Sequence, residues 1–236
     1  MRYDIYLESG PQRRKTWLYV PGLPGCSTVA ATSDSAAEAA REAIHERIEF
    51  LRRHGDDVTN LEPIGLVVAE HVIERKFLGF GQGAFPQDRL PLSASAAERR
   101  LRWAGWTRVE LVAAAMAQTR PLHEKPSSSG RSAASILSHV AESEWSYVSS
   151  TLGTLRGGSA VMAAIEAAGE RPWDALAAER EALMARLRAM TPDELSRVVE
   201  RGEGKPPRSA SRMLRRMLEH EWEHTLELRA RATDEP

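Results

Sequence analysis

The hydrophobic period of the chain changes between its two halves, and this change constrains the fold more than any other feature. Apolar residues alternate with polar ones in RYDIYLE (2–8) and in KTWLYV (15–20), and a period of two predicts β-strands. Beyond residue 96, apolar residues recur three and four positions apart, which predicts amphipathic helices. The sequence therefore predicts an α+β chain of two domains, with the sheet confined to the first.

The first half is predicted to have the element order β-β-β-α-β. A third strand is expected at 27–32, after the chain is broken by PGLPGC, and a fourth at 63–74. Between them, the stretch from Ser35 to His54 has the period of a helix, and Ser35-x-x-Glu38 fits a capping box. These elements predict a small α+β domain.

The two predicted domains are joined by a stretch rich in Gly and Pro, residues 76–97, which is expected to be a linker. It contains neither G-x-G-x-x-G nor a Walker pattern, so it does not indicate a phosphate-binding loop. The predicted domains are then residues 1–75 and 98–236. The second domain is predicted to be a four-helix bundle. Its helices are expected at about 108–119, at about 132–152, in PWDALAAEREALMARLRAM and in SASRMLRRMLEHEWEHTLELRARA.

The overall composition excludes several classes of function. The 32 Lys and Arg residues nearly balance the 33 Asp and Glu residues, so no global positive field draws in nucleic acid, and nucleic-acid binding is not expected. Cys26 is the single cysteine and no signal-peptide pattern opens the sequence, which together predict a cytoplasmic protein. No apolar run approaches the roughly 20 residues that cross a bilayer.

Two histidines one helical turn apart, His220 and His224 in HEWEH, indicate metal chemistry. Residues four apart on a helix lie about 40° from each other, so both imidazoles can reach one ion. The stretch also fits H-E-x-x-H, in which Glu221 would be the general base of a zinc protease. Proteases of that kind take a third ligand from further along the chain, where Glu227 is one of few candidates. A protease is therefore not the expected class.

A third ligand is expected upstream, because catalytic zinc sites usually have three protein ligands and one open position. The best candidate is His139 in SHVAESEW, which shares a helical flank with Ile136 and Val140 and is expected to be partly buried. A hydrogen-bonded core histidine and a solvated, charge-dense helix face explain the same residues without a metal. The metal hypothesis thus requires His139 to converge with the pair.

The segment from about Ala96 to Ala232 resembles the DinB-like (DinB/YfiT) superfamily of four-helix metalloproteins, through ILSHVAESEWSY and MLEHEWEHTLE. This resemblance implies a three-histidine site of His139, His220 and His224 for a divalent metal ion, with open positions for water or substrate. It also implies a metal-dependent enzyme, a thiol transferase or a hydrolase of a small molecule. Three imidazoles suit zinc, nickel and iron alike.

Charged residues near these histidines are candidates for supporting roles. Glu223 or Glu144 is predicted to accept a hydrogen bond from a ligand histidine or to act as a base. Arg208, Arg212 and Arg216 are candidates to hold an anionic substrate, such as a thiol that carries carboxylates, although a solvated helix face explains them too.

Residues 1–74 resemble a HicB-type antitoxin domain, through YVPGLPGCSTVAATSDSAAEAAREAIHERIEFLRRHG. In that family the domain binds a small RNA-cleaving toxin, often with a DNA-binding domain attached, but no helix-turn-helix or ribbon-helix-helix segment follows here. The resemblance implies an alternative function, a non-enzymatic regulatory protein that binds a protein partner or a nucleic acid through this domain and uses the bundle as a scaffold. A homodimer is compatible with either half.

Overall fold

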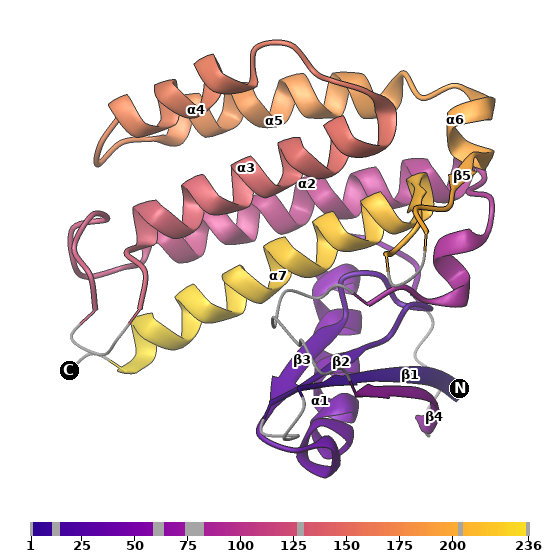
Figure 1. Cartoon of the computed structure of the whole chain (residues 1–236). Coiled ribbons are helices and arrows are strands. Elements are labelled where there is room, and N and C mark those ends of the chain that lie inside the picture. The colour runs from indigo at the N-terminus through magenta and orange to yellow at the C-terminus, as the bar shows by residue number, and fades with distance from the viewer. Residues whose placement is uncertain are drawn as a thin grey trace. The chain divides into compact units, whose positions relative to one another are not determined.

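A computed structural model of the chain describes residues 2–10, 15–58, 64–73, 83–126, 130–202 and 205–234. Its contacts divide the chain into two compact units (Figure 1). One unit combines Met1–Leu90 with Val199–Pro207, and the other combines Pro91–Val198 with Arg208–Pro236. The predicted linker, residues 76–97, lies outside the described residues as far as residue 82. Its remainder holds the short 3-10 helix η1 (Pro86–Arg89) and the start of a long helix.

The first unit contains a four-stranded sheet in the order β3-β2-β1-β4. The strands are β1 (Arg2–Ser9), β2 (Thr16–Tyr19), β3 (Ser27–Ala30) and β4 (Gly65–Ile73). β1 and β3 pair antiparallel with β2, whereas β4 pairs parallel with β1. With one helix between β3 and β4, the element order β-β-β-α-β is as predicted.

Helix α1 (Ser33–Arg53) covers one face of this sheet (Figure 1). Apolar residues three and four positions apart form its buried side: Ala36, Ala40, Ile44, Ile48 and Leu51. The predicted capping box lies one turn too late. Thr32 is the N-cap, and its hydroxyl accepts a hydrogen bond from the backbone N–H of Ser35 at 3.1 Å.

The turn between β2 and β3 is fastened to α1 by a buried arginine. Nη2 of Arg47 donates a hydrogen bond to the carbonyl of Pro24 at 3.1 Å. Gly25 has a φ of 87°, and a Cβ atom there would lie 2.4 Å from that same Nη2. The turn therefore requires glycine at position 25, both for its backbone conformation and for space.

Aromatic side chains form a second cluster in the first unit. Tyr6, Trp17 and Tyr19 project from β1 and β2, and Phe85 packs against them just before η1. The ring centroids of Phe85 and Tyr6 are 4.7 Å apart, and those of Phe85 and Tyr19 are 5.2 Å apart. The sheet thus packs against α1 and, through these aromatic side chains, against Phe85.

The second unit is a helical bundle. Its four long helices are α2 (Ala94–Met116), α3 (Ala133–Leu152), α5 (Trp173–Arg188) and α7 (Ala210–Asp234). Each packs against two others, in the cyclic order α2-α7-α3-α5. The described residues also include α4 (Gly158–Ala167), α6 (Pro192–Ser196) and the two-residue strands β5 (Val198–Val199) and β6 (Arg208–Ser209). The prediction of four helices is therefore too low by two short ones.

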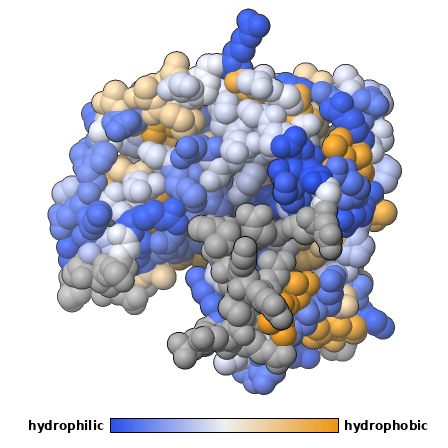
Figure 2. Space-filling view, in the orientation of Figure 1, coloured by the Kyte–Doolittle hydropathy of each residue, from blue (hydrophilic) through white to orange (hydrophobic). Residues whose placement is uncertain are grey.

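Helix α4 packs against α3 and α5, and its first residue lies close to α3. A Cβ atom at Gly158 would lie 2.5 Å from Nε1 of Trp145, so the glycine lets the two helices approach. The outer side of α4 exposes Ala160, Ala163 and Ala164, and pale apolar surface lies over α4 in Figure 2. Ile165 is the only fully buried residue of α4, and Val161 and Met162 pack partly buried one turn earlier, so its apolar stripe is too short to have predicted this helix.

Helix α2 begins at Ala94, well before the predicted start near residue 108. Ser93 is its N-cap and accepts a hydrogen bond from the backbone N–H of Ala96 at 3.1 Å. Gly105 and the buried Arg108 interrupt the apolar pattern of this helix, which explains why its first half was not predicted.

Helix α7 is buried on more than one side, because it packs against both α2 and α3. Leu214 and Trp222 are buried, and so are Met213 and Met217. None of the helices in the described ranges is long and apolar enough to cross a membrane.

Five charged side chains from the four long helices meet inside the bundle: Arg108, Glu144, Glu179, Arg180 and Glu221. Arg108 lies 2.5 Å from Glu144, 2.5 Å from Glu221 and 3.2 Å from Glu179. Arg180 lies 2.9 Å from Glu144 and 2.6 Å from Glu221. We call these five residues the core ion network.

The core ion network has three carboxyl groups and two guanidinium groups. Burial raises the pKa of Glu144 to about 8 and also raises the pKa of Glu179, because a buried carboxylate loses its hydration. A proton on one carboxyl group near neutral pH leaves two negative and two positive charges. The network is then electrically balanced.

Candidate metal centre

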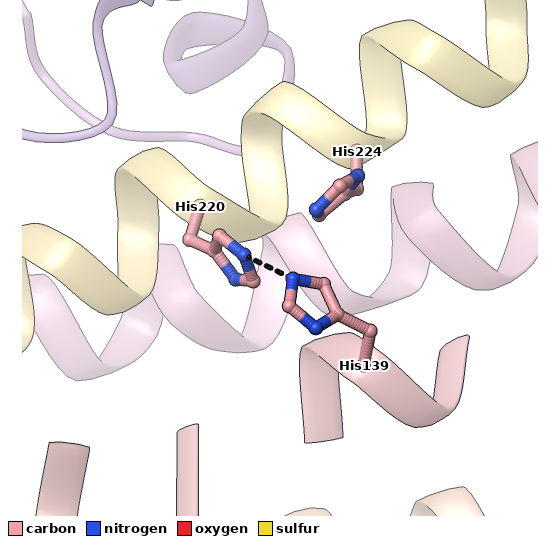
Figure 3. Close-up of side chains that lie close together, drawn as sticks. All are labelled: His139, His220 and His224. Atoms are coloured by element: carbon pink, nitrogen blue, oxygen red, sulfur yellow. Dashed lines mark hydrogen bonds between the residues drawn. The ribbon is translucent and has the colours of Figure 1, made fainter. Parts of the chain in front are cut away.

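The three histidines predicted as ligands lie together between α3 and α7 (Figure 3). Nε2 of His139 is 3.1 Å from Nε2 of His220. One nitrogen from each of His139, His220 and His224 lies within 4.8 Å of the others. The structure therefore brings together side chains from two helices that are far apart in the sequence.

The positions of the rings follow from the packing of the two helices. His220 and His224 are one turn apart on α7 and project from the same side of it (Figure 3). His139 comes from α3, where Ile136 and Val140 are fully buried, and α3 packs against α7. This packing turns His139 toward the pair.

The histidines lie in a setting that disfavours their protonated form. His220 and His224 are buried, and His139 is half-buried. Burial lowers the pKa of His139 to about 4, and the positive charge of Arg131 adds to the effect. Burial also lowers the pKa of His220 to about 2, helped by His224 and Arg216. Both imidazoles are thus neutral at pH 7, which is the form that binds a metal ion.

The arrangement fits the geometry of a divalent ion. A tetrahedral zinc ion with Zn–N bonds of about 2.0–2.1 Å holds two ligand nitrogens about 3.3 Å apart. The 3.1 Å between the Nε2 atoms of His139 and His220 is close to that value. Three protein ligands leave at least one coordination position open.

A hydrogen bond fixes the orientation of His224. Its Nδ1 lies 2.7 Å from Oε2 of Glu227, so Nδ1–H can donate to the carboxylate and leave Nε2 for an ion. Glu227 in turn pairs with Arg231, whose Nη1 donates to the carbonyl of Arg131 at 2.6 Å. Burial by itself would raise the pKa of Glu227, but the hydrogen bond from His224 outweighs burial and the pKa is lowered.

The sequence did not predict this role of Glu227, which it offered only as a metal ligand. Its spacing of three residues from His224 on one helix was the available signal. Glu144, predicted as a histidine partner or base, pairs with Arg108 and Arg180, and Glu223 is half-buried on α7. The roles of Glu144 and Glu223 stay predictions. Glu221, at the position of a protease base, is fully buried in the core ion network.

Positive charge reaches the histidines from two arginines. Arg216, a predicted substrate contact, is buried, lies 3.0 Å from Glu219 and has its guanidinium 6.0 Å from the ring of Tyr147. Arg131 was not predicted, but its charge helps to lower the pKa of both His139 and His220. Arg208 is exposed and Arg212 is half-buried.

Fold and cluster together define a helical bundle with a candidate metal centre between two of its long helices. The family model described as the DinB superfamily matches residues 104–228, more than half of the chain and all three histidines. The chain belongs to the DinB superfamily. This match does not extend to the N-terminal sheet, so the HicB-like resemblance of residues 1–74 stays a prediction. Neither the curated proteins nor the solved structures contain a match to the chain.

Proposed function

We propose that the protein binds one divalent metal ion through His139, His220 and His224 and uses it to transform a small molecule. The reaction classes we propose are thiol transfer and hydrolysis. The observation that supports this function is the convergence of three imidazole rings from α3 and α7, two of them with a lowered pKa.

A bound zinc, nickel or iron ion would lower the pKa of a thiol or water molecule in the open position and so supply a nucleophile at neutral pH. The residues of the chain prepare the site for that chemistry. Burial keeps His139 and His220 neutral, and Glu227 holds His224 with its Nε2 available. We retain Glu223 and Glu144 as proposed proton acceptors.

An anionic substrate fits the charges around the site. Arg131 and Arg216 both place positive charge close enough to lower the pKa of His220. A substrate with carboxylate groups, such as an anionic thiol, would be attracted to this positive region.

Metal analysis of protein without a histidine tag tests the proposal. Wild-type protein is expected to bind about one divalent ion per chain, and His220→Ala is expected to lose it because two ligands seldom suffice. The exposed His123→Ala is the matched control and should retain the ion. If wild-type protein contains no divalent ion and takes up none on titration, the proposal is wrong.

The edge of the sheet supports a second candidate function, a HicB-like regulatory protein. β4 lies at one edge and, within the described residues, pairs only with β1. Val68 and Ile73 on β4 are 51% and 42% exposed. An exposed edge can accept a strand from a partner protein or from a second copy of the chain. Light scattering of the purified protein, alone and with a co-expressed partner, would reveal either complex, and a monomer in both cases would oppose this candidate.

A further inference from the structure

The core ion network joins the two helices that carry the histidines. Arg108 and Arg180 each contact both Glu144 of α3 and Glu221 of α7, so these four residues form a closed ring. Glu144 follows His139 by five residues, and Glu221 directly follows His220. The two arginines come from α2 and α5, which flank the histidine-bearing helices in the bundle.

Ionic contacts of this kind restrict movement more than apolar contacts do. The hydrophobic effect has no preferred direction, so apolar contacts select a helix register only through the fit of the side chains. A charge-assisted hydrogen bond requires a donor–acceptor distance near 2.7–2.9 Å and a favourable angle. All members of the ring are less than a tenth exposed, and therefore a shift that broke a contact would leave a buried charge without a partner.

We propose that Arg108 and Arg180 are positioning residues for the metal centre. They fix the separation and register of α3 and α7, so that His139 meets His220 and His224 at coordination distance. This inference rests on the proposed function, that the histidines bind a metal ion. A coordination site tolerates errors of only about 0.2 Å in its metal–ligand distances, so a small shift between α3 and α7 would weaken binding.

A double variant opens the ring. Arg180→Met/Glu144→Gln removes one guanidinium and one carboxyl group, and leaves Arg108 with Glu221 and Glu179. The matched control, Arg186→Met/Glu194→Gln, removes a partly buried ion pair between α5 and α6 that does not involve α7. Arg180→Lys tests rescue, since lysine keeps the charge but lacks the forked guanidinium. Circular dichroism and thermal unfolding establish which variants fold.

The first readout is the affinity for Ni²⁺ alone, measured by competition with a chelator. The ring variant is expected to bind Ni²⁺ at least about 10-fold more weakly than wild-type protein, as when outer partners of ligands are lost. The control variant should bind as wild-type protein does, and Arg180→Lys should restore part of the affinity. The absorption spectrum of Co²⁺-loaded protein should change in the ring variant, because the coordination geometry changes.

The second readout needs no metal. Spin labels at the exposed positions Ser146 of α3 and Ala230 of α7 report the distance between the helices, and the native Cys26 is buried and does not compete for label. The ring variant should broaden this distance distribution in metal-free protein, which a role of Glu144 in chemistry would not do. An unchanged distribution overturns the inference. If the distribution broadens but wild-type protein binds no Ni²⁺, the proposed function is wrong. The inference that the ring fixes the separation of α3 and α7 then still holds.

Discussion

At the scale of single residues, the hydrogen bond from His224 to Glu227 selects the nitrogen that faces the other two rings. With Nδ1 occupied by the carboxylate, only Nε2 remains to bind an ion. A carboxylate in this position also restricts the rotation of the imidazole. The candidate centre therefore includes a residue that would orient a ligand histidine and not hold the ion itself.

Replacing Glu227 with Ala is expected to weaken metal binding by about 10- to 100-fold, because His224 loses its orientation and its tautomer. The comparison variant is Glu223→Ala, one turn earlier on the same helix. It removes the carboxylate that the sequence predicts as a hydrogen-bond acceptor for a ligand histidine. Competition with a chromophoric chelator measures both affinities. If only Glu223→Ala weakens binding, the role assigned to Glu227 is wrong.

The sequence could predict the histidines but not their partners. The spacing of His220 and His224 places both on one side of a helix, and the need for a third ligand upstream, together with the apolar flank of His139, pointed to the third ring. Several carboxylates flank the pair on α7: Glu219, Glu221, Glu223 and Glu227. Which of them turns toward an imidazole depends on how α7 packs, and the sequence contains no local pattern for that.

At the scale of elements, the core ion network changes how a buried helix looks in sequence. Arg108, Arg180 and Glu221 occupy core positions that a search for apolar stripes assigns to solvent. The start of α2 was missed for a related reason, and α4 was missed because its apolar stripe spans only about one turn. Long helices with apolar faces, α3 and α7, were predicted close to their observed bounds.

The network also predicts how stability depends on pH. Burial raises the pKa of Glu144 from 4.5 to about 8, so the folded protein keeps a proton that the unfolded chain releases above about pH 4.5. The free energy of unfolding should therefore fall, by up to a few kcal/mol, as the pH rises toward 8. The lowered pKa values of His139 and His220 have the opposite effect: they make the free energy of unfolding rise with pH, but only below about pH 6.5. Urea unfolding between about pH 6.5 and 8, with a chelator present, isolates the carboxyl effect.

Glu179→Gln should flatten this decline. It removes a neighbouring carboxylate that contributes to the raised pKa of Glu144. Glu142→Gln, an exposed change on α3, should keep the slope of wild-type protein. A decline that is equally steep in Glu179→Gln would show that Glu179 does not contribute to the pH dependence.

At the scale of the whole molecule, the chain combines two units with different architectures. The change in hydrophobic period predicted a sheet followed by helices, and the structure agrees. The segment Val199–Pro207, which belongs with the first unit, could not be predicted. Contacts between segments so distant in sequence leave no periodic trace in either of them.

Metal binding is expected to stabilise one unit and not the other. Calorimetry of the full chain should show two unfolding transitions, of which only that of the bundle moves to higher temperature with added Ni²⁺. An ion at 100 times its dissociation constant contributes about 2.7 kcal/mol to the folded state. His220→Ala should abolish the shift. Equal shifts of both transitions would contradict a site confined to the bundle.

Helices α2 and α7 pack side by side, although the other helices of the bundle lie between them in sequence. Bringing together two segments separated by about a hundred residues costs roughly 4 kcal/mol of chain entropy. Contacts between such distant segments also slow folding. The helical content of the bundle should then recover early in refolding, before α7 docks. The return of affinity for an ion would report the later event, since His220 and His224 reach His139 only when α7 docks against α3.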